Sequence, residues 1–143
     1  MPKIEKLSYV AEPQLAVTPA SVSAGAVTPV AVDASGGFDR AQFIVVLGAF
    51  GTNAGFDCEI TESATSGGAY TLITGSGITA VTAAKSGKLI IVDVPVNGSK
   101  PFLKLRGTVG TAAVVMSAIC QTYNGTRRLS DTVLEDVAEE VVV

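Results

Sequence analysis

The sequence has no histidine and no tryptophan, and only two of its 143 residues are cysteine. Histidine is the commonest metal ligand and the commonest general base, so its absence argues against most metal centres and acid–base sites. Charged residues are also scarce, at 16% of the chain against roughly 25% in ordinary soluble domains. Together with a mean hydropathy of +0.46, this scarcity predicts that something other than water covers part of the surface.

Long apolar runs are missing too. The longest, at 43–50 and 112–120, are far shorter than the roughly 18 to 20 residues that span a bilayer, so we expect no membrane partner. The first residues, MPKIEKLSYV, alternate charged with apolar side chains, which is not typical of a secretion signal. We therefore expect synthesis in a reducing cytoplasm, where Cys58 and Cys120 stay buried thiols rather than forming a disulfide.

The sequence does contain the regular turn residues that are typical of an all-β domain. Short β-branched apolar runs are broken about every ten residues by Gly, Asn, Asp and Ser. The pattern predicts strands near 25–32, 40–49, 55–61, 69–74, 88–94, 101–109 and 111–123. Because each sheet must cover its apolar face, we expect a single antiparallel β-sandwich of about seven to eight strands.

The two ends of the chain differ from this central domain. We expect an extended N-terminal arm over 1–20, the sandwich over 21–125 and an acidic tail over 126–143. Proline removes a backbone donor, so Pro19 and Pro29 place their segments at sheet edges or in extended arms.

The tail carries two competing signals. In 130–143 apolar pairs recur every four residues between acids, and Thr132 and Glu135 form a capping-box pair, which is typical of a short amphipathic helix. Valine, however, is a mediocre helix former, and so short a helix is marginal by itself. A short helix and an arm are therefore both predicted alternatives for the tail.

The segment 75-GSGITA-80 fits a loose dinucleotide-binding pattern after a predicted strand. That site requires a helix after the glycines. Here the following residues are β-branched, and Gly87 interrupts them. We interpret the segment as a long hairpin loop, and we expect no cofactor.

The stretch 56-FDCEITES-63 gathers carboxylates beside a thiol, as a metal or acid–base site would. In a strand, however, successive side chains face opposite sides. Cys58 then faces the core, whereas Asp57 and Glu59 face outward, about 6.5 to 7 Å apart. The stretch therefore predicts a two-sided strand, with no metal ligand and no catalytic residue.

Charge is unevenly distributed along the chain. Five cations and one acid lie between Lys85 and Arg106, and five acids but no cation follow Arg128, so the two regions can pair within or between chains. In 101–109 the alternation puts the cations on one face and the leucines in the core. The predicted interface residues are these cations, the later basic pair and the apolar residues of the tail: Lys100, Lys104, Arg106, Arg127, Arg128, Val133, Leu134, Val137 and Val141.

Basic residues lie near aromatic ones in 100–106 and 123–128, as in some proteins that bind single-stranded nucleic acid. The chain is acidic overall, with a net charge of −3. A nucleic-acid partner is therefore not expected.

Three segments resemble a known group of proteins: 38-FDRAQFIVVLGAFG-51, 56-FDCEITES-63 and 101-PFLKLRGTVGTAAVVMSAI-119. They look like small β-sandwich head proteins of tailed bacteriophages, above all the capsid decoration, or cement, proteins. The resemblance covers about residues 15 to 123 and lies in texture rather than in catalytic motifs. It implies a non-enzymatic virion protein, made in the host cytoplasm, that binds the outer surface of the capsid, often as a homotrimer. Its partners would be the major capsid protein and further copies of itself.

Other functions remain as alternatives. A head-completion or tail structural protein would share the same features. A carbohydrate-binding β-sandwich would also be all-β, although such modules present aromatic platforms, and this chain has three tyrosines and no tryptophan. An enzyme is a third class, for which no specific motif is present.

Overall fold

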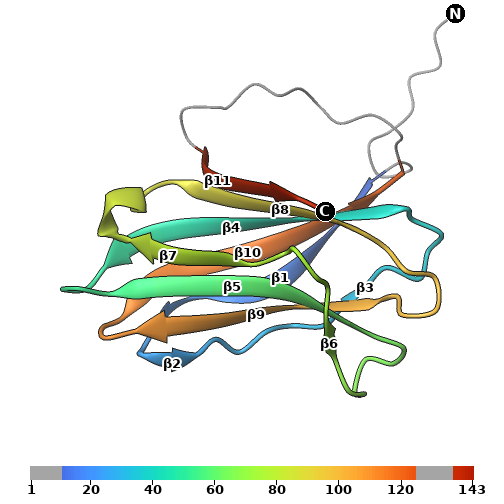
Figure 1. The fold of residues 1–143 in the computed structure, drawn as a ribbon, viewed down its shortest axis with the longest axis horizontal. Coiled ribbons are helices and arrows are strands. Elements are labelled where there is room, and N and C mark those ends of the chain that lie inside the picture. Colours follow the sequence, from blue (N-terminus) through green and yellow to red (C-terminus); the bar gives the residue numbers. More distant parts are fainter. Residues whose placement is uncertain (1–10, 125–136) are drawn as a thin grey trace, which may run out of the picture.

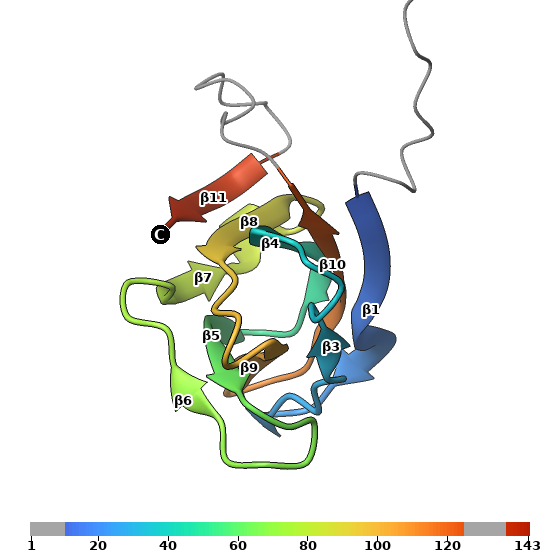
Figure 2. The same ribbon diagram turned by 90° about the vertical axis from the view of Figure 1, so that its right-hand side faces the viewer.

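The computed structural model describes residues 11–124 and 137–143, which form two β-sheets packed face to face (Figure 1, Figure 2). Sheet A has the strand order β1-β10-β4-β8-β11. Sheet B has the order β2-β9-β5-β6, with β3 also pairing with β9 and β7 with β5. The predicted fold class, an all-β sandwich, is confirmed.

The strands follow the predicted runs closely at 40–49, 55–61, 88–94, 101–109 and 111–123, whereas the runs at 25–32 and 69–74 contain only two-residue strands. Sheet A contains β1 (Ala11–Val22), β4 (Arg40–Phe50), β8 (Leu89–Pro95), β10 (Val114–Tyr123) and β11 (Val137–Val142). Sheet B contains β2 (Gly25–Ala26), β3 (Val32–Asp33), β5 (Gly55–Ser63), β6 (Thr71–Leu72), β7 (Ile78–Thr82) and β9 (Phe102–Gly110). One short 3₁₀ turn, η1 (Ala83–Lys85), precedes β8, and within the described ranges no helix is long and apolar enough to cross a membrane.

The core lies between the two sheets and is built by alternation. In β9, Leu103 and Leu105 are fully buried, whereas Arg106 is exposed, as the sequence predicts. From sheet A, Phe43 and Leu47 enter the same core, and from sheet B, so do Phe56 and Ile60. Burial of such side chains contributes about 1.5 to 3 kcal/mol each, so these alternating positions hold the sheets together.

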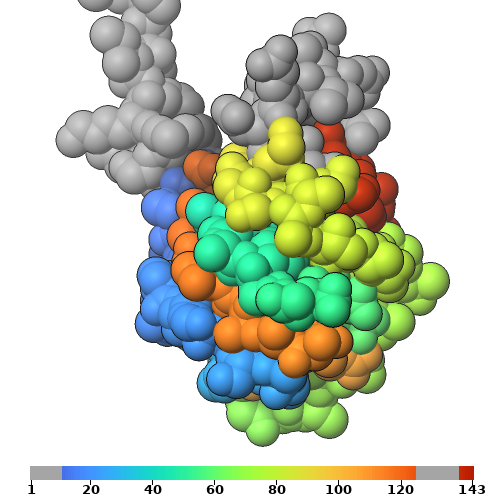
Figure 3. Space-filling model, turned by 90° about the vertical axis from the view of Figure 1, so that its left-hand side faces the viewer, coloured from blue at the N-terminus to red at the C-terminus, as the bar shows by residue number. Residues whose placement is uncertain are grey.

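One end of the sandwich is closed by two turns (Figure 3). There β4 runs into β5 and β9 runs into β10. The Gly51 amide donates a hydrogen bond to the Ala113 carbonyl at 2.8 Å, which links the two turns. A Cβ atom at Gly51 would lie 2.8 Å from the Cβ of Ala112, so only glycine fits this close approach without a shift.

The predicted boundary between an N-terminal arm and the sandwich, at residue 20, falls inside β1. Ala11–Val22 pairs antiparallel with β10 along its length and forms an edge of sheet A. Prolines are tolerated there because an edge strand needs only half of its backbone groups for the ladder. The predicted arm is thus part of the sheet from Ala11 onward, and residues 1–10 lie outside the described part.

The Gln14 side chain connects this edge of sheet A to sheet B. It donates from Nε2 to the Asp33 carbonyl at 2.7 Å and accepts from the Asp33 amide at 3.0 Å. Both polar groups of the amide are therefore used, and β1 is joined to β3 across the side of the sandwich.

The long loop predicted between 74 and 88 contains a strand. Ile78 and Val81 are buried, and Ile78–Thr82 forms β7 beside β5 with a register shift. Ser76 is also buried and donates to the Ile73 carbonyl at 2.7 Å while it accepts from the Ile60 amide at 3.0 Å. The hairpin interpretation was therefore incomplete, and no helix follows Gly75 as a dinucleotide site would require.

Val137–Val142 is not helical, which corrects one of the two alternatives for the tail. It forms β11, the parallel neighbour of β8, and Val141 lies opposite Val92 and packs against the core. Valine suits a strand better than a helix, and the open edge of β8 supplies backbone partners. The proposed helix start at Thr132 and Glu135 lies outside the described residues.

Candidate functional site

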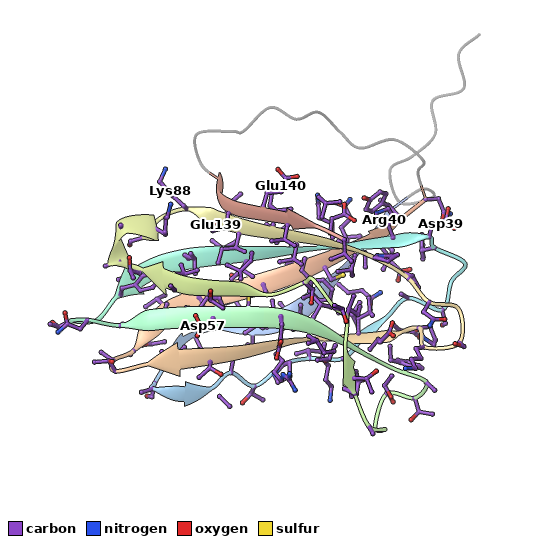
Figure 4. All side chains as sticks on the ribbon, viewed as in Figure 1. Asp39, Arg40, Asp57, Lys88, Glu139 and Glu140 are labelled. Carbon is purple, nitrogen blue, oxygen red and sulfur yellow. The ribbon has the colours of Figure 1, made fainter. Side chains whose placement is uncertain are left out.

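The outer face of sheet B carries the carboxylates and cations that the sequence singled out. Glu59 of β5 lies directly opposite Arg106 of β9, and the two side chains form an ion pair. Asp57 lies opposite Thr108 on the same face (Figure 4). The predicted two-sided strand is confirmed, because Cys58 between these carboxylates is buried.

The other two predicted cations also have partners within the chain. Lys104 Nζ lies 4.4 Å from the centre of the Tyr70 ring. Lys100 Nζ lies 3.8 Å from a Glu62 carboxylate oxygen and 3.2 Å from the Thr71 hydroxyl. Exposed pairs of this kind contribute roughly 0 to 1 kcal/mol each. Lys100, Lys104 and Arg106 therefore contact acids and an aromatic ring of sheet B, whereas β11 lies on the other sheet.

A shallow groove of about 280 Å³ runs along this charged face, between β5, β7 and β9. Its two carboxylates already have partners, because Asp57 Oδ1 accepts the Ala80 amide at 2.6 Å and Glu59 binds Arg106. In the part of the chain that the structure describes, no three His, Cys, Asp or Glu side chains converge on a point where a metal ion would bind. The groove thus offers structural contacts between strands rather than free ligands.

The thiols face the interior. Burial, followed by the charges of Asp57 and Glu59, raises the pKa of Cys58 to about 12. Burial, followed by the charge of Asp93, also raises the pKa of Cys120. Both cysteines are free, so they act as small hydrophobic core residues.

The outer face of sheet A is different in character, because a row of apolar side chains crosses it. Leu15 lies opposite Ile119, Ile119 opposite Ile44, and Ile44 opposite Ile91. The row therefore spans the adjacent strands β1, β10, β4 and β8, with Leu15 and Ile119 exposed by 44% and 40%.

Two valines widen this row. Val46 of β4 and Val115 of β10 are exposed by 45% and 44%, on the same side of the sheet. We name these six residues the apolar face: Leu15, Ile44, Val46, Ile91, Val115 and Ile119. Ser117 and Gln121 of β10 interrupt it only at half-buried positions.

A polar cluster bounds the apolar face at one end. The Asp93 carboxylate accepts hydrogen bonds from Arg40 Nε at 2.7 Å and from the Tyr123 hydroxyl. Arg40 also donates from its guanidinium to the Val143 carbonyl at 2.9 Å, and Figure 4 shows Arg40 at this end of sheet A.

The pKa values follow from this geometry. Burial and the contacts with Asp93 raise the pKa of Tyr123 to about 12. Burial opposes the charge of Arg40, but the hydrogen bond and charge of Asp93 outweigh it, so the pKa of Arg40 is raised. The cluster therefore keeps Arg40 charged and Tyr123 protonated near neutral pH.

The sequence interpretation missed the apolar face, although a signal for it exists. In 43-FIVVL-47 and 114-VVMSAIC-120, apolar residues occupy both alternating sets of positions. Such continuous runs are typical of strands that are covered on both sides. In β4 and β10 only the inner set is covered by the opposite sheet, which leaves the outer set exposed.

Of the predicted tail residues, Val141 is half-buried beside β8 and Val137 begins β11. Arg127, Arg128, Val133 and Leu134 lie outside the described residues. The structure thus separates the predicted interface residues, with the described cations on sheet B and Val141 on sheet A.

No protein-family model and no curated protein matches the chain. Among solved structures, one described as the structure of infectious bursal disease virus Gx strain aligns with 82% of this chain, at 11% identity and a TM-score of 0.46. The alignment covers 33% of that chain, so this protein spans about a third of its length. A similarity at this level does not decide the function.

Proposed function

We propose that the protein is a non-enzymatic structural component of a bacteriophage virion. It binds the outer surface of the capsid and stabilises contacts between subunits of the major capsid protein. The observation that carries the proposal is the apolar face of sheet A, where apolar side chains of four adjacent strands meet solvent, as is typical of a surface that binds a partner. The segments that resemble capsid decoration proteins agree with it, since one of them contains β4 and another contains the first part of β10.

The apolar face is preformed for docking. Its central row lies on four hydrogen-bonded strands, so these side chains need little ordering when a partner covers them. Fully burying an exposed Leu, Ile or Val stabilises by about 1.5 to 3 kcal/mol, and residues that are already half covered gain roughly half of that. The six residues together therefore supply about 5 to 9 kcal/mol per copy, much of which the entropy cost of association offsets, and this suits a protein whose many copies act together.

Several copies in one unit would strengthen this binding. A homotrimer, as the resemblance implies, presents three apolar faces to neighbouring capsid subunits and turns weak contacts into a tight attachment. Light scattering on the purified protein measures this oligomeric state.

The test is binding to undecorated heads assembled from the major capsid protein of the same phage. Ile119→Lys places a charge at the centre of the apolar face and is expected to weaken binding by at least about tenfold, because an ammonium group loses its water there. Leu72→Lys is the matched control, since Leu72 is exposed by 46% on β6 of sheet B. Equal binding by the two variants would contradict the assignment of this face.

Electron microscopy of decorated heads tests the location independently. Density repeated over the capsid surface, with sheet A facing the shell, is the expected result. Density confined to one vertex or to the tail would replace decoration by head completion or a tail role.

A further inference from the structure

β11 is joined to the rest of sheet A in an unusual way. The other described strand pairs are antiparallel, whereas β11 runs parallel to β8. β10 ends at Tyr123, beside Arg40 and so at the Pro95 end of β8, but β11 begins opposite Leu89 at the far end of β8. Residues 125–136 therefore connect two strands whose joined ends lie at opposite ends of sheet A, with β4 and β8 between them.

These twelve residues are longer than this path requires. The path from the end of β10 to the start of β11 is about 25 Å, from the rise per strand residue and the spacing between strands. The segment from Asn124 to Val137 can extend over about 43 Å. The segment is therefore about 18 Å longer than the path to its own β8, a length that is available for reaching β8 of an adjacent copy.

The contacts of β11 are those of an element that another copy can supply. They include the parallel backbone ladder to β8, the packing of Val141 against the core, and two hydrogen bonds of Val143. In those two bonds the Val143 amide donates to the Asp93 carbonyl at 2.9 Å and its carbonyl accepts from Arg40 at 2.9 Å. Glu139 and Glu140 are exposed along the edge (Figure 4).

We propose that β11 is exchanged between copies, so that the C-terminal strand of one copy pairs with β8 of its neighbour. In either arrangement the strand forms the same ladder with β8, the same packing of Val141 and the same hydrogen bond from Arg40 to the Val143 carbonyl. The exchange therefore costs little free energy. Neighbouring copies in an oligomer or on a surface hold their strands at effective concentrations near the millimolar range, which favours the exchanged form. This assembly mode is independent of what the apolar face binds.

Disulfide trapping tests the exchange. Glu140 of β11, which is exposed, lies directly opposite Ile91 of β8, which is half-buried. The distance between Cα atoms of directly opposite residues on neighbouring strands suits a disulfide. Two full-length chains with different tags, one carrying Ile91→Cys and the other Glu140→Cys, are co-expressed, purified, concentrated to about 1 mM and oxidised. A disulfide that joins the two tags can form only between copies.

The control pair is Ile44→Cys in one chain and Ile119→Cys in the other, because these residues are opposite each other on the interior strands β4 and β10. We expect the β11–β8 mixture to give about ten times more mixed disulfide than the control mixture. Single chains carrying both control cysteines should close internally, which verifies the oxidation.

Two results would overturn the proposal. The first has two parts: the double variant Ile91→Cys and Glu140→Cys forms its disulfide within one chain, and the mixture of the two single variants gives no more mixed disulfide than the control mixture. The second concerns truncation after Asn124, which removes β11 and is expected to convert the oligomer to the monomer. An oligomer of unchanged size in light scattering after this truncation would contradict the exchange.

Discussion

The Nε atom of Arg40 lies 2.7 Å from Oδ1 of Asp93, although the two residues belong to different strands, β4 and β8. The Asp93 side chain is only 8% exposed, and this guanidinium is the cation that accompanies it in the interior. Arg40→Met is expected to lower the free energy of unfolding by about 2 to 3 kcal/mol, because a buried carboxylate then lacks its cation. Urea unfolding measures the change.

The control for that variant is Arg106→Met. Arg106 also pairs with an acid, Glu59, but its side chain is 61% exposed, and removal of an exposed pair costs less than about 1 kcal/mol. Equal losses for the two arginine variants would show that burial of Asp93 does not set the strength of its pair.

Gly107 of β9 lies against the ring of Phe56. A Cβ atom at this position would approach the ring carbon Cε2 to 2.9 Å and Val27 Cγ2 to 3.1 Å. Gly107→Ala is therefore expected to lower the free energy of unfolding by about 1 to 3 kcal/mol through overpacking. Gly110→Ala, in the same strand but with no atom within 4 Å of the new Cβ, should change it little. Thermal unfolding of the two variants measures both changes in stability.

Tyr123 makes stability depend on alkaline pH. Its pKa is raised from 10.0 to about 12, so the folded state holds the phenol proton more tightly than the unfolded state does. This contribution is complete below pH 10 and is lost as the pH rises toward about 12. Tyr123→Phe should therefore flatten the fall of unfolding free energy between these pH values, measured by urea titration. An unchanged slope in the variant would contradict the role of this hydroxyl.

Cys58 and Cys120 should resist thiol reagents in the folded protein. The thiolate is the reactive form, and burial raises both pKa values, that of Cys58 to about 12. At pH 8 we expect modification at least about a hundredfold slower than in urea, because each group must first be exposed. Fast labelling of either residue without denaturant would mean that its sheet opens readily.

The long strands β5 and β9 of sheet B and the centre of sheet A could be predicted, because their patterns are local. Alternation placed Leu103 and Leu105 inside and Arg106 outside, and the turn residues placed the ends of β4 and β9 within about a residue. The two edge strands of sheet A were not predicted correctly, for a different reason. β1 and β11 are defined by partners far away in the chain, Ala11 with Tyr123 and Val137 with Leu89, and no local pattern specifies such pairs.

The candidate site divides in the same way. The sequence showed that Lys104 and Arg106 share a face, but it did not show that Tyr70 and Glu59 already contact them. For the apolar face, the residues were visible as continuous runs, whereas their exposure depends on which face the opposite sheet covers. That choice is a tertiary property and leaves no mark on β4 or β10 alone.

The strand order of sheet A also determines when each strand can find its partners during synthesis. β4 lies between β10 and β8, and both of these neighbours follow it in the chain, so β4 leaves the ribosome before either partner exists. During that interval 43-FIVVL-47 is a β-branched, uncharged segment with two free edges, the kind that joins other chains. A slow step, delayed until β10 has been synthesised and can pair with β4, is therefore built into the topology.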